Sequence, residues 1–154
     1  MRSSRSASAA GDLLIQSSGS VGDVLGAHHR DIEDRCLALM SRCGADARSL
    51  VRRWEKIEHE LFEHMAAEER MVFPAYQRAD ARNARDLLDE HTVLRERALE
   101  IGIAIHLGTI RSEHLQRFVD HLRAHARHED VSLYRWAQRN LDHNERHALH
   151  AQVG

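Results

Sequence analysis

Four long segments of this sequence carry apolar residues at alternating steps of three and four, the spacing that places side chains along one face of an α-helix. The segments span roughly residues 20–43, 46–77, 80–108 and 109–140. Only a few residues separate one segment from the next, so the segments have to fold back on one another. The sequence therefore predicts an all-α fold, an up-down-up-down antiparallel four-helix bundle.

Capping signals indicate where several of these helices begin and end. Ser20 and Asp23 have the spacing of an N-terminal capping box, and a turn from Gly44 to Asp46 closes the same helix. Asp46 can cap the second helix. Because a proline lacks the backbone N–H, we expect Pro74 to weaken or kink the last turn of that helix.

The composition agrees with a single helical domain. Among 154 residues there are one proline and eight glycines, so little in the chain interrupts a helix. We expect a disordered tail over residues 1–19 and the bundle over residues 20–141. The C-terminal extension, residues 142–154, is expected to add a short helical turn or to fray.

The charge of the chain argues against two classes of partner. The formal net charge is −2 and both signs are interspersed, so no basic face is available for nucleic acid or anionic lipid. No apolar stretch is long enough for a signal peptide or a membrane span. Cys36 and Cys43 lie too far apart along one predicted helix for a strain-free disulfide. We expect neither a nucleic-acid nor a membrane partner, and a cytoplasmic location.

Each apolar column is interrupted by a histidine, and two columns also by a glutamate. The interrupting residues are His29, His64, Glu68, His91, His125 and Glu129. A buried glutamate is costly unless its charge is compensated, and two facing glutamates repel each other. In each of the two histidine–glutamate pairs the residues are four apart, so both side chains project from one helix face and can chelate one site.

These six residues are expected at one level of the bundle. Counted along the helices at ~1.5 Å per residue, they fall within roughly 10 Å of one another in height. The chain also has 13 histidines, and histidine is the commonest metal ligand among side chains. We therefore predict that the six residues form a metal site in the core. The other histidines are expected at the surface, with His59, His121 and His128 close enough to support the ligands.

The donor set favours particular metals. Four imidazoles and two carboxylates suit iron, manganese or zinc better than metals that prefer thiolates. Carboxylates on opposite helices can bridge two ions, and such pairs in four-helix bundles typically hold iron or manganese. We predict two non-haem, carboxylate-bridged iron ions, ahead of manganese or zinc.

Four short motifs resemble the hemerythrin-like HHE cation-binding domain. They are AHHRDI at 27–32, HMAAEERMVFP at 64–74, EH at 90–91 and HARHED at 125–130. The resemblance covers about Val21 to Asn140, and the double glutamate followed by Phe-Pro is its most specific part. It implies a di-iron centre inside the bundle that binds or senses dioxygen, nitric oxide or peroxide.

The resemblance also implies a role for each of the six residues. By this resemblance, Glu68 and Glu129 would bridge the two irons. His29 and His64 would hold one iron, and His91 and His125 would hold the other.

Oxygen-carrying hemerythrins have a further histidine one turn before the position of His91, where this chain has Leu87. The second iron then has an open position, unless His121 or His128 fills it. An open position favours reaction with peroxide or nitric oxide over reversible oxygen carriage.

Two other functions stay open at this point. The metal could be structural in a helical sensor or interaction module, and the chain could bind iron or zinc without redox turnover. Whether the protein is an enzyme also stays open.

Overall fold

The computed structural model describes residues 19–42 and 46–153, and these residues form seven helices and no strand. The all-α prediction is therefore confirmed for the part of the chain that is described. The predicted tail, except Gly19, lies outside the described residues, and so do Cys43 and most of the turn expected at Gly44.

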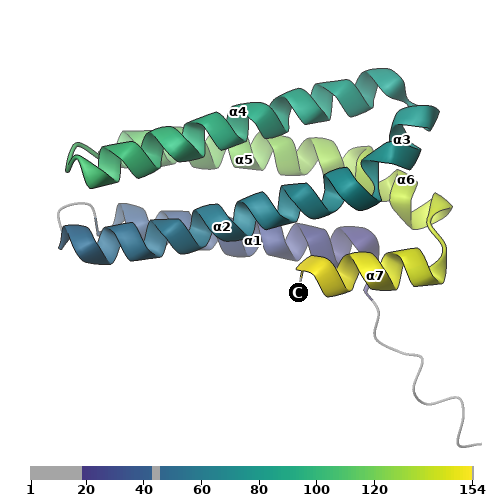
Figure 1. Cartoon of the computed structure of the whole chain (residues 1–154), viewed down its shortest axis with the longest axis horizontal. Helices are drawn as coiled ribbons and strands as arrows, with labels where there is room; N and C mark the ends of the chain where they lie inside the picture. The colour runs from purple at the N-terminus through teal and green to yellow at the C-terminus, as the bar shows by residue number, and fades with distance from the viewer. Residues whose placement is uncertain (1–18, 43–45, 154) are drawn as a thin grey trace, which may run out of the picture.

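Four long helices run side by side. They are α1 (Val21–Met40), α2 (Ala47–Met71), α4 (Ala81–His106) and α5 (Ser112–Val131). Figure 1 shows that each of them points in the opposite direction to the one before it along the long axis. Helices α2 and α5 both pack against α1, and α4 also packs against both of them. The side chains on the inner faces of the four helices therefore meet along a common interior.

Side-chain caps begin α1 and α2 as the sequence predicts. The N–H of Asp23 donates to Ser20 Oγ over 3.1 Å, and the N–H of Ser20 donates to Asp23 Oδ2 over 3.0 Å. Asp46 and Asp80 cap α2 and α4 by accepting from backbone N–H groups. After α4, Gly108 has a φ of 68°, a left-handed conformation that glycine adopts at no steric cost.

The second predicted helix is in fact two helices. Helix α2 ends at Met71, and α3 (Phe73–Ala79) begins after Val72. Pro74 cannot donate a hydrogen bond to the preceding turn, which favours an interruption here. The kink expected near Pro74 is therefore a complete break two residues earlier.

The fourth predicted helix is also divided, which the sequence did not predict. Helix α5 ends before Ser132 and α6 (Leu133–Asn140) follows. The Ser132 hydroxyl donates to the carbonyl of His128, a local bond that competes with regular helix hydrogen bonding. The break changes the helical phase, so that Tyr134 is buried while Trp136 is only partly buried.

The C-terminal extension is more regular than expected. It forms α7 (His143–Val153), which lies against α1 and α2 (Figure 1). Asp142 and Glu145 cap its first turn reciprocally, each accepting a backbone N–H over 2.8 Å. Leu149 is completely buried. Helix α7 is thus an integral part of the fold.

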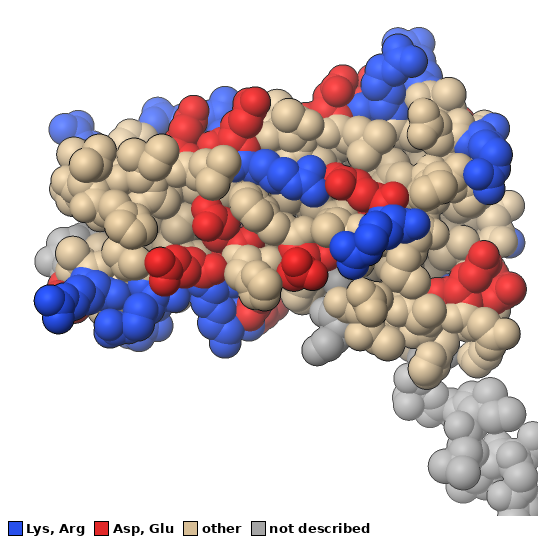
Figure 2. Space-filling model, viewed as in Figure 1, with Lys and Arg blue, Asp and Glu red and all other residues tan. Residues whose placement is uncertain are grey.

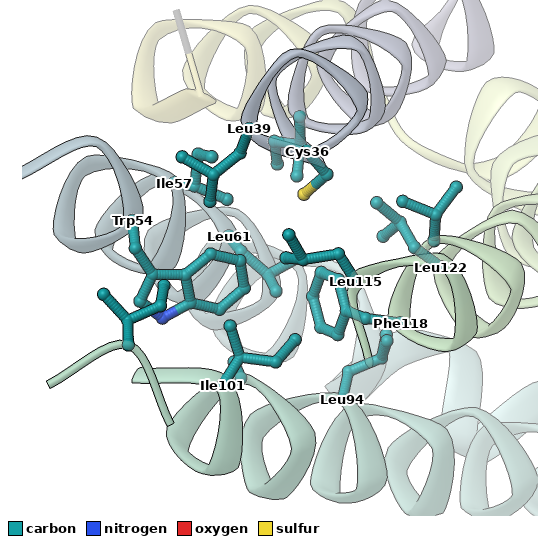
Figure 3. Close-up of a cluster of buried hydrophobic side chains, with 14 of the residues drawn as sticks. Cys36, Leu39, Trp54, Ile57, Leu61, Leu94, Ile101, Leu115, Phe118 and Leu122 are labelled. Atoms are coloured by element: carbon teal, nitrogen blue, oxygen red, sulfur yellow. The ribbon is translucent and has the colours of Figure 1, made fainter. Parts of the chain in front are cut away.

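Two apolar clusters fill the interior at opposite ends of the long helices. The first lies between α1, α2, α4 and α5, where Figure 3 shows Trp54, Leu61 and Phe118 in mutual proximity. The second lies at the end closed by α3 and α6 and contains Leu25 and Leu87. The segments of α1, α2, α4 and α5 between the two clusters carry the histidines and glutamates of the predicted site.

The surface carries charges of both signs. On the face shown in Figure 2, lysines and arginines are interspersed with aspartates and glutamates. None of the described helices combines the length and the apolar character that a membrane span requires.

Candidate metal centre

All six predicted metal ligands are buried between the two apolar clusters. Their side chains are at most 3% exposed: His29, His64, Glu68, His91, His125 and Glu129. Within the described ranges they are the only buried histidines and the only buried charged side chains. The structure therefore brings together every residue that interrupts the apolar columns.

The first pair of histidines comes from α1 and α2. The rings of His29 and His64 lie 4.4 Å apart between centroids. His64 Nε2 is 3.2 Å from Glu68 Oε1, and His29 Nε2 is 3.5 Å from Glu129 Oε2. Both Nε2 atoms therefore face carboxylate oxygens in the interior.

The second pair comes from α4 and α5. The rings of His91 and His125 are 4.8 Å apart between centroids. Glu129 Oε1 lies 3.3 Å from His91 Nε2 and 3.2 Å from His125 Nε2. Glu68 Oε2 lies 3.6 Å from His91 Nε2. Each glutamate thus turns one oxygen toward each pair of histidines.

This geometry offers two groups of donor atoms. In each group, one atom from each of three residues lies within 4.8 Å of the others, and both groups share Glu129. One group adds His29 and His64, and the other adds His91 and His125. Imidazole nitrogens and carboxylate oxygens are ligands that iron, manganese and zinc accept.

Several of these buried atoms lack a hydrogen-bond partner. They are both ring nitrogens of His29, Glu68 Oε2 and His125 Nε2. A buried polar atom without a hydrogen bond costs roughly 1–3 kcal/mol. Because a cation would satisfy the inward-facing atoms among them at once, the donor set fits metal ions.

The pKa values indicate how strongly this interior requires positive charge. Burial lowers the pKa of His125, but the charge of Glu129 and the hydrogen bond to Glu90 outweigh it and raise that pKa to about 10. Burial raises the pKa of Glu129, but the charge of His125 and the hydrogen bond with His91 hold it well below the usual value. Without a metal ion, a proton on His125 therefore provides part of the charge that the buried carboxylates require.

Tyr134 is a further residue of this centre, and the sequence did not predict it. Its hydroxyl lies 2.6 Å from Glu68 Oε1 and 2.8 Å from Glu129 Oε2. Burial and the two carboxylates raise the pKa of Tyr134 well above 10. No sequence signal distinguished this residue, because its inward orientation depends on the break at Ser132.

The three histidines expected to support the ligands, His59, His121 and His128, differ in their contacts with the site. His128 Nδ1 lies 2.8 Å from Glu90 Oε1, and the other oxygen of Glu90 lies 2.9 Å from His125 Nδ1. His59 and His121 are exposed, and His121 donates to a carbonyl of its own helix. The structure thus connects His128 to a predicted ligand through Glu90 and leaves the other two outside the site.

The model of the hemerythrin HHE cation-binding domain matches residues 21–137. The chain belongs to the hemerythrin HHE family. The predicted resemblance to this family is therefore confirmed. Searches of curated proteins and of solved structures found no match.

Membership of the HHE family and the buried histidine–glutamate groups together imply that this chain binds metal. The two groups of donor atoms pair the histidines as the resemblance to the family implied. The assignment of individual ligands stays a prediction, which metal analysis of variants can test.

We predict that Glu68→Ala and Glu129→Ala lower the metal content of the protein far more than His59→Ala or His143→Ala. Both glutamates are completely buried among the imidazoles, whereas both control histidines are exposed. Loss of a direct ligand should weaken binding by more than the roughly 10–100-fold typical of an outer partner. Elemental analysis of protein purified without an affinity tag measures the effect. Equal metal content in all four variants would contradict the assignment.

We also predict that metal uptake at pH 7 releases protons. The pKa of about 10 keeps His125 protonated in the metal-free protein at this pH, and a metal ion competes with that proton for Nε2. The apparent affinity should therefore rise as the pH increases from 6 to 8, by about tenfold per pH unit for each proton displaced. Calorimetry in buffers of different ionisation enthalpy counts the protons. Affinity that is independent of pH would disprove the competition.

Proposed function

We propose that this chain is a non-haem di-iron protein that binds, senses or detoxifies small oxidants in the cytoplasm. The long helices would form an up-down-up-down antiparallel bundle over residues 20–141, with two carboxylate-bridged iron ions in its core. The proposed partner is dioxygen, nitric oxide or hydrogen peroxide, and neither nucleic acid nor a membrane takes part.

The observation that carries this proposal is that both buried carboxylates face both pairs of histidines. Glu129 turns Oε1 toward His91 and His125 and Oε2 toward His29. A carboxylate that chelated one ion would direct both oxygens at the same place, whereas a bridging carboxylate divides them. Carboxylate-bridged pairs in four-helix bundles typically hold iron or manganese, which supports iron over zinc.

The side chains around the site keep bulk water out. Leu25, Leu61, Leu87 and Leu122 are at most 1% exposed and belong to the two apolar clusters that enclose the site. A dry interior strengthens the electrostatic interactions between donors and ions. When bound, two ferrous ions would supply two electrons. Hydrogen peroxide that accepted these two electrons and two protons would give two molecules of water.

The hydroxyl of Tyr134 holds a proton where such a reaction requires one. It lies between Glu68 Oε1 and Glu129 Oε2 and can donate to one of them at a time. Its raised pKa keeps it protonated at neutral pH. Tyr134 therefore holds its proton in contact with the two carboxylates of the site.

Leu87 supports peroxide or nitric oxide over reversible oxygen carriage. It is completely buried at the position where oxygen-carrying hemerythrins have an additional histidine. The side chain of Leu87 provides no donor atom, so the ion held by His91 and His125 would have one protein ligand fewer. An open position is where a small molecule can bind and be reduced.

Iron stoichiometry with an optical spectrum tests the proposal. We expect two irons per chain, and a near-ultraviolet band of a diferric pair that appears when the diferrous protein is mixed with peroxide. One zinc per chain and no colour would eliminate the redox function. A spectrum that forms with dioxygen and disappears reversibly on its removal would instead indicate a carrier.

We predict that Tyr134→Phe retains iron but reacts more slowly with peroxide. The substitution keeps the ring and removes only the hydroxyl that contacts the two carboxylates. Loss of a positioned proton donor typically slows a reaction by about 10²–10⁴-fold. Stopped-flow absorption of the diferrous protein measures the rate.

The matched control for this variant is Tyr76→Phe, which removes the hydroxyl of another buried tyrosine in the same apolar cluster. The Tyr76 hydroxyl interacts with Ser132 and not with the site carboxylates. Equal rates for Tyr134→Phe, Tyr76→Phe and the unsubstituted protein would exclude Tyr134 as a proton donor.

A further inference from the structure

The outward nitrogens of the four site histidines have different partners in the two halves of the centre. In one half, His91 Nδ1 lies 2.8 Å from Glu69 Oε1 and His125 Nδ1 lies 2.9 Å from Glu90 Oε2. A carboxylate that accepts from Nδ1–H orients the ring with Nε2 inward and raises its basicity. We call His91 and His125 the carboxylate-backed half.

Both of these carboxylates are fixed by a second contact. Arg95 Nη1 lies 2.9 Å from Glu69 Oε1, and His128 Nδ1 lies 2.8 Å from Glu90 Oε1. Each carboxylate is partly buried, with its side chain 30% exposed at Glu69 and 37% at Glu90. The orientation of the two imidazoles is therefore established before an ion arrives.

The other half of the centre lacks such carboxylates. His64 Nδ1 lies 2.9 Å from His28 Nδ1, and His29 Nδ1 has no hydrogen-bond partner. If His64 turns its Nε2 lone pair toward an ion, its Nδ1–H donates and His28 accepts as a neutral imidazole. A neutral acceptor raises the basicity of a ligand less than a carboxylate does. We call His29 and His64 the imidazole-backed half.

The inner donors do not distinguish the two halves. Each half has two imidazoles, and Glu68 and Glu129 direct oxygens toward both. The halves differ in the partners of their outward nitrogens, and also in the Tyr134 hydroxyl, which contacts the two carboxylate oxygens that face His29 and His64. Changes to such outer partners typically alter metal affinity by about 10–100-fold.

A surface groove leads to the imidazole-backed half. It has a volume of about 530 Å³, and among the residues that line it are His28, His59, Glu63, His64 and Gln152. His59 and Glu63 are exposed, His28 is half-buried and His64 is completely buried. A cation that approaches along the groove therefore meets imidazole and carboxylate groups before it reaches His64.

We propose that the two halves hold divalent ions unequally: the carboxylate-backed half retains its ion, and the imidazole-backed half exchanges its ion through the groove beside His28. This inference rests on the proposed two-ion centre and extends it. In this arrangement Glu69, Glu90 and His28 are positioning residues, because each acts on an ion through a ligand histidine.

Titration of the metal-free full chain with Co²⁺ tests the inequality, because the visible absorption of Co²⁺ reports its coordination. We expect two steps, the first at least about tenfold tighter than the second. Glu69→Gln and Glu90→Gln should each weaken the first step by about 10–100-fold and change its spectrum. His28→Ala should weaken only the second step. Glu96→Gln, an exposed charge change on the same helix as Glu90, is the matched control and should change neither.

Release kinetics test the groove. When the two-ion protein is mixed with excess chelator, one ion should leave rapidly and the other slowly. Ala27→Trp places a large side chain on the lining of the groove and should slow only the rapid phase. Ala38→Trp, at another exposed position on α1 outside this groove, should leave both phases unchanged.

The outcomes separate this inference from the proposed function. Two ions bound with equal affinity, or equal effects of Glu90→Gln and His28→Ala on both steps, would overturn the inequality and leave the di-iron proposal standing. Release that Ala27→Trp does not slow would overturn the route. If no cobalt binds, the two-ion centre and this inference both fail.

Discussion

Two carboxylates in a dry helical interior are the constraint on which the rest of this structure depends. Glu68 and Glu129 are both completely buried, and removing an uncompensated charge from water costs several kcal/mol. His125, whose pKa is raised to about 10, supplies part of that compensation as imidazolium when metal is absent, and a bound cation would supply it instead. The two apolar clusters then account for the stability of the fold, because they seal the polar layer on both sides.

The sequence predicted the six polar residues because each lies within an unbroken stretch of helix. His91, for example, follows Leu87 by four residues and precedes Leu94 by three, and all three are buried as that spacing requires. Helical periodicity is local, so it could be extrapolated across α1, α2, α4 and α5. The meeting of the columns at one level followed from helix lengths and short connections.

Features that depend on contacts between helices could not be predicted in this way. The phase change that buries Tyr134 follows a break at Ser132, where a serine is equally compatible with a continuous helix. Asp142 and Glu145 did carry a capping signal for α7. Whether that short helix persists depends on the burial of Leu149, which no local pattern specifies.

The two helix breaks lie at the same end of the site, each just after a site glutamate. Helix α2 is interrupted at Val72, four residues after Glu68, and α5 at Ser132, three residues after Glu129. Each break allows a short helix, α3 or α6, to turn across the end of the long helices and pack there (Figure 1). The glutamates are thus covered from that end by Tyr134 and its neighbours. The groove between α1 and α2 beside His28 is the route that we propose for an ion.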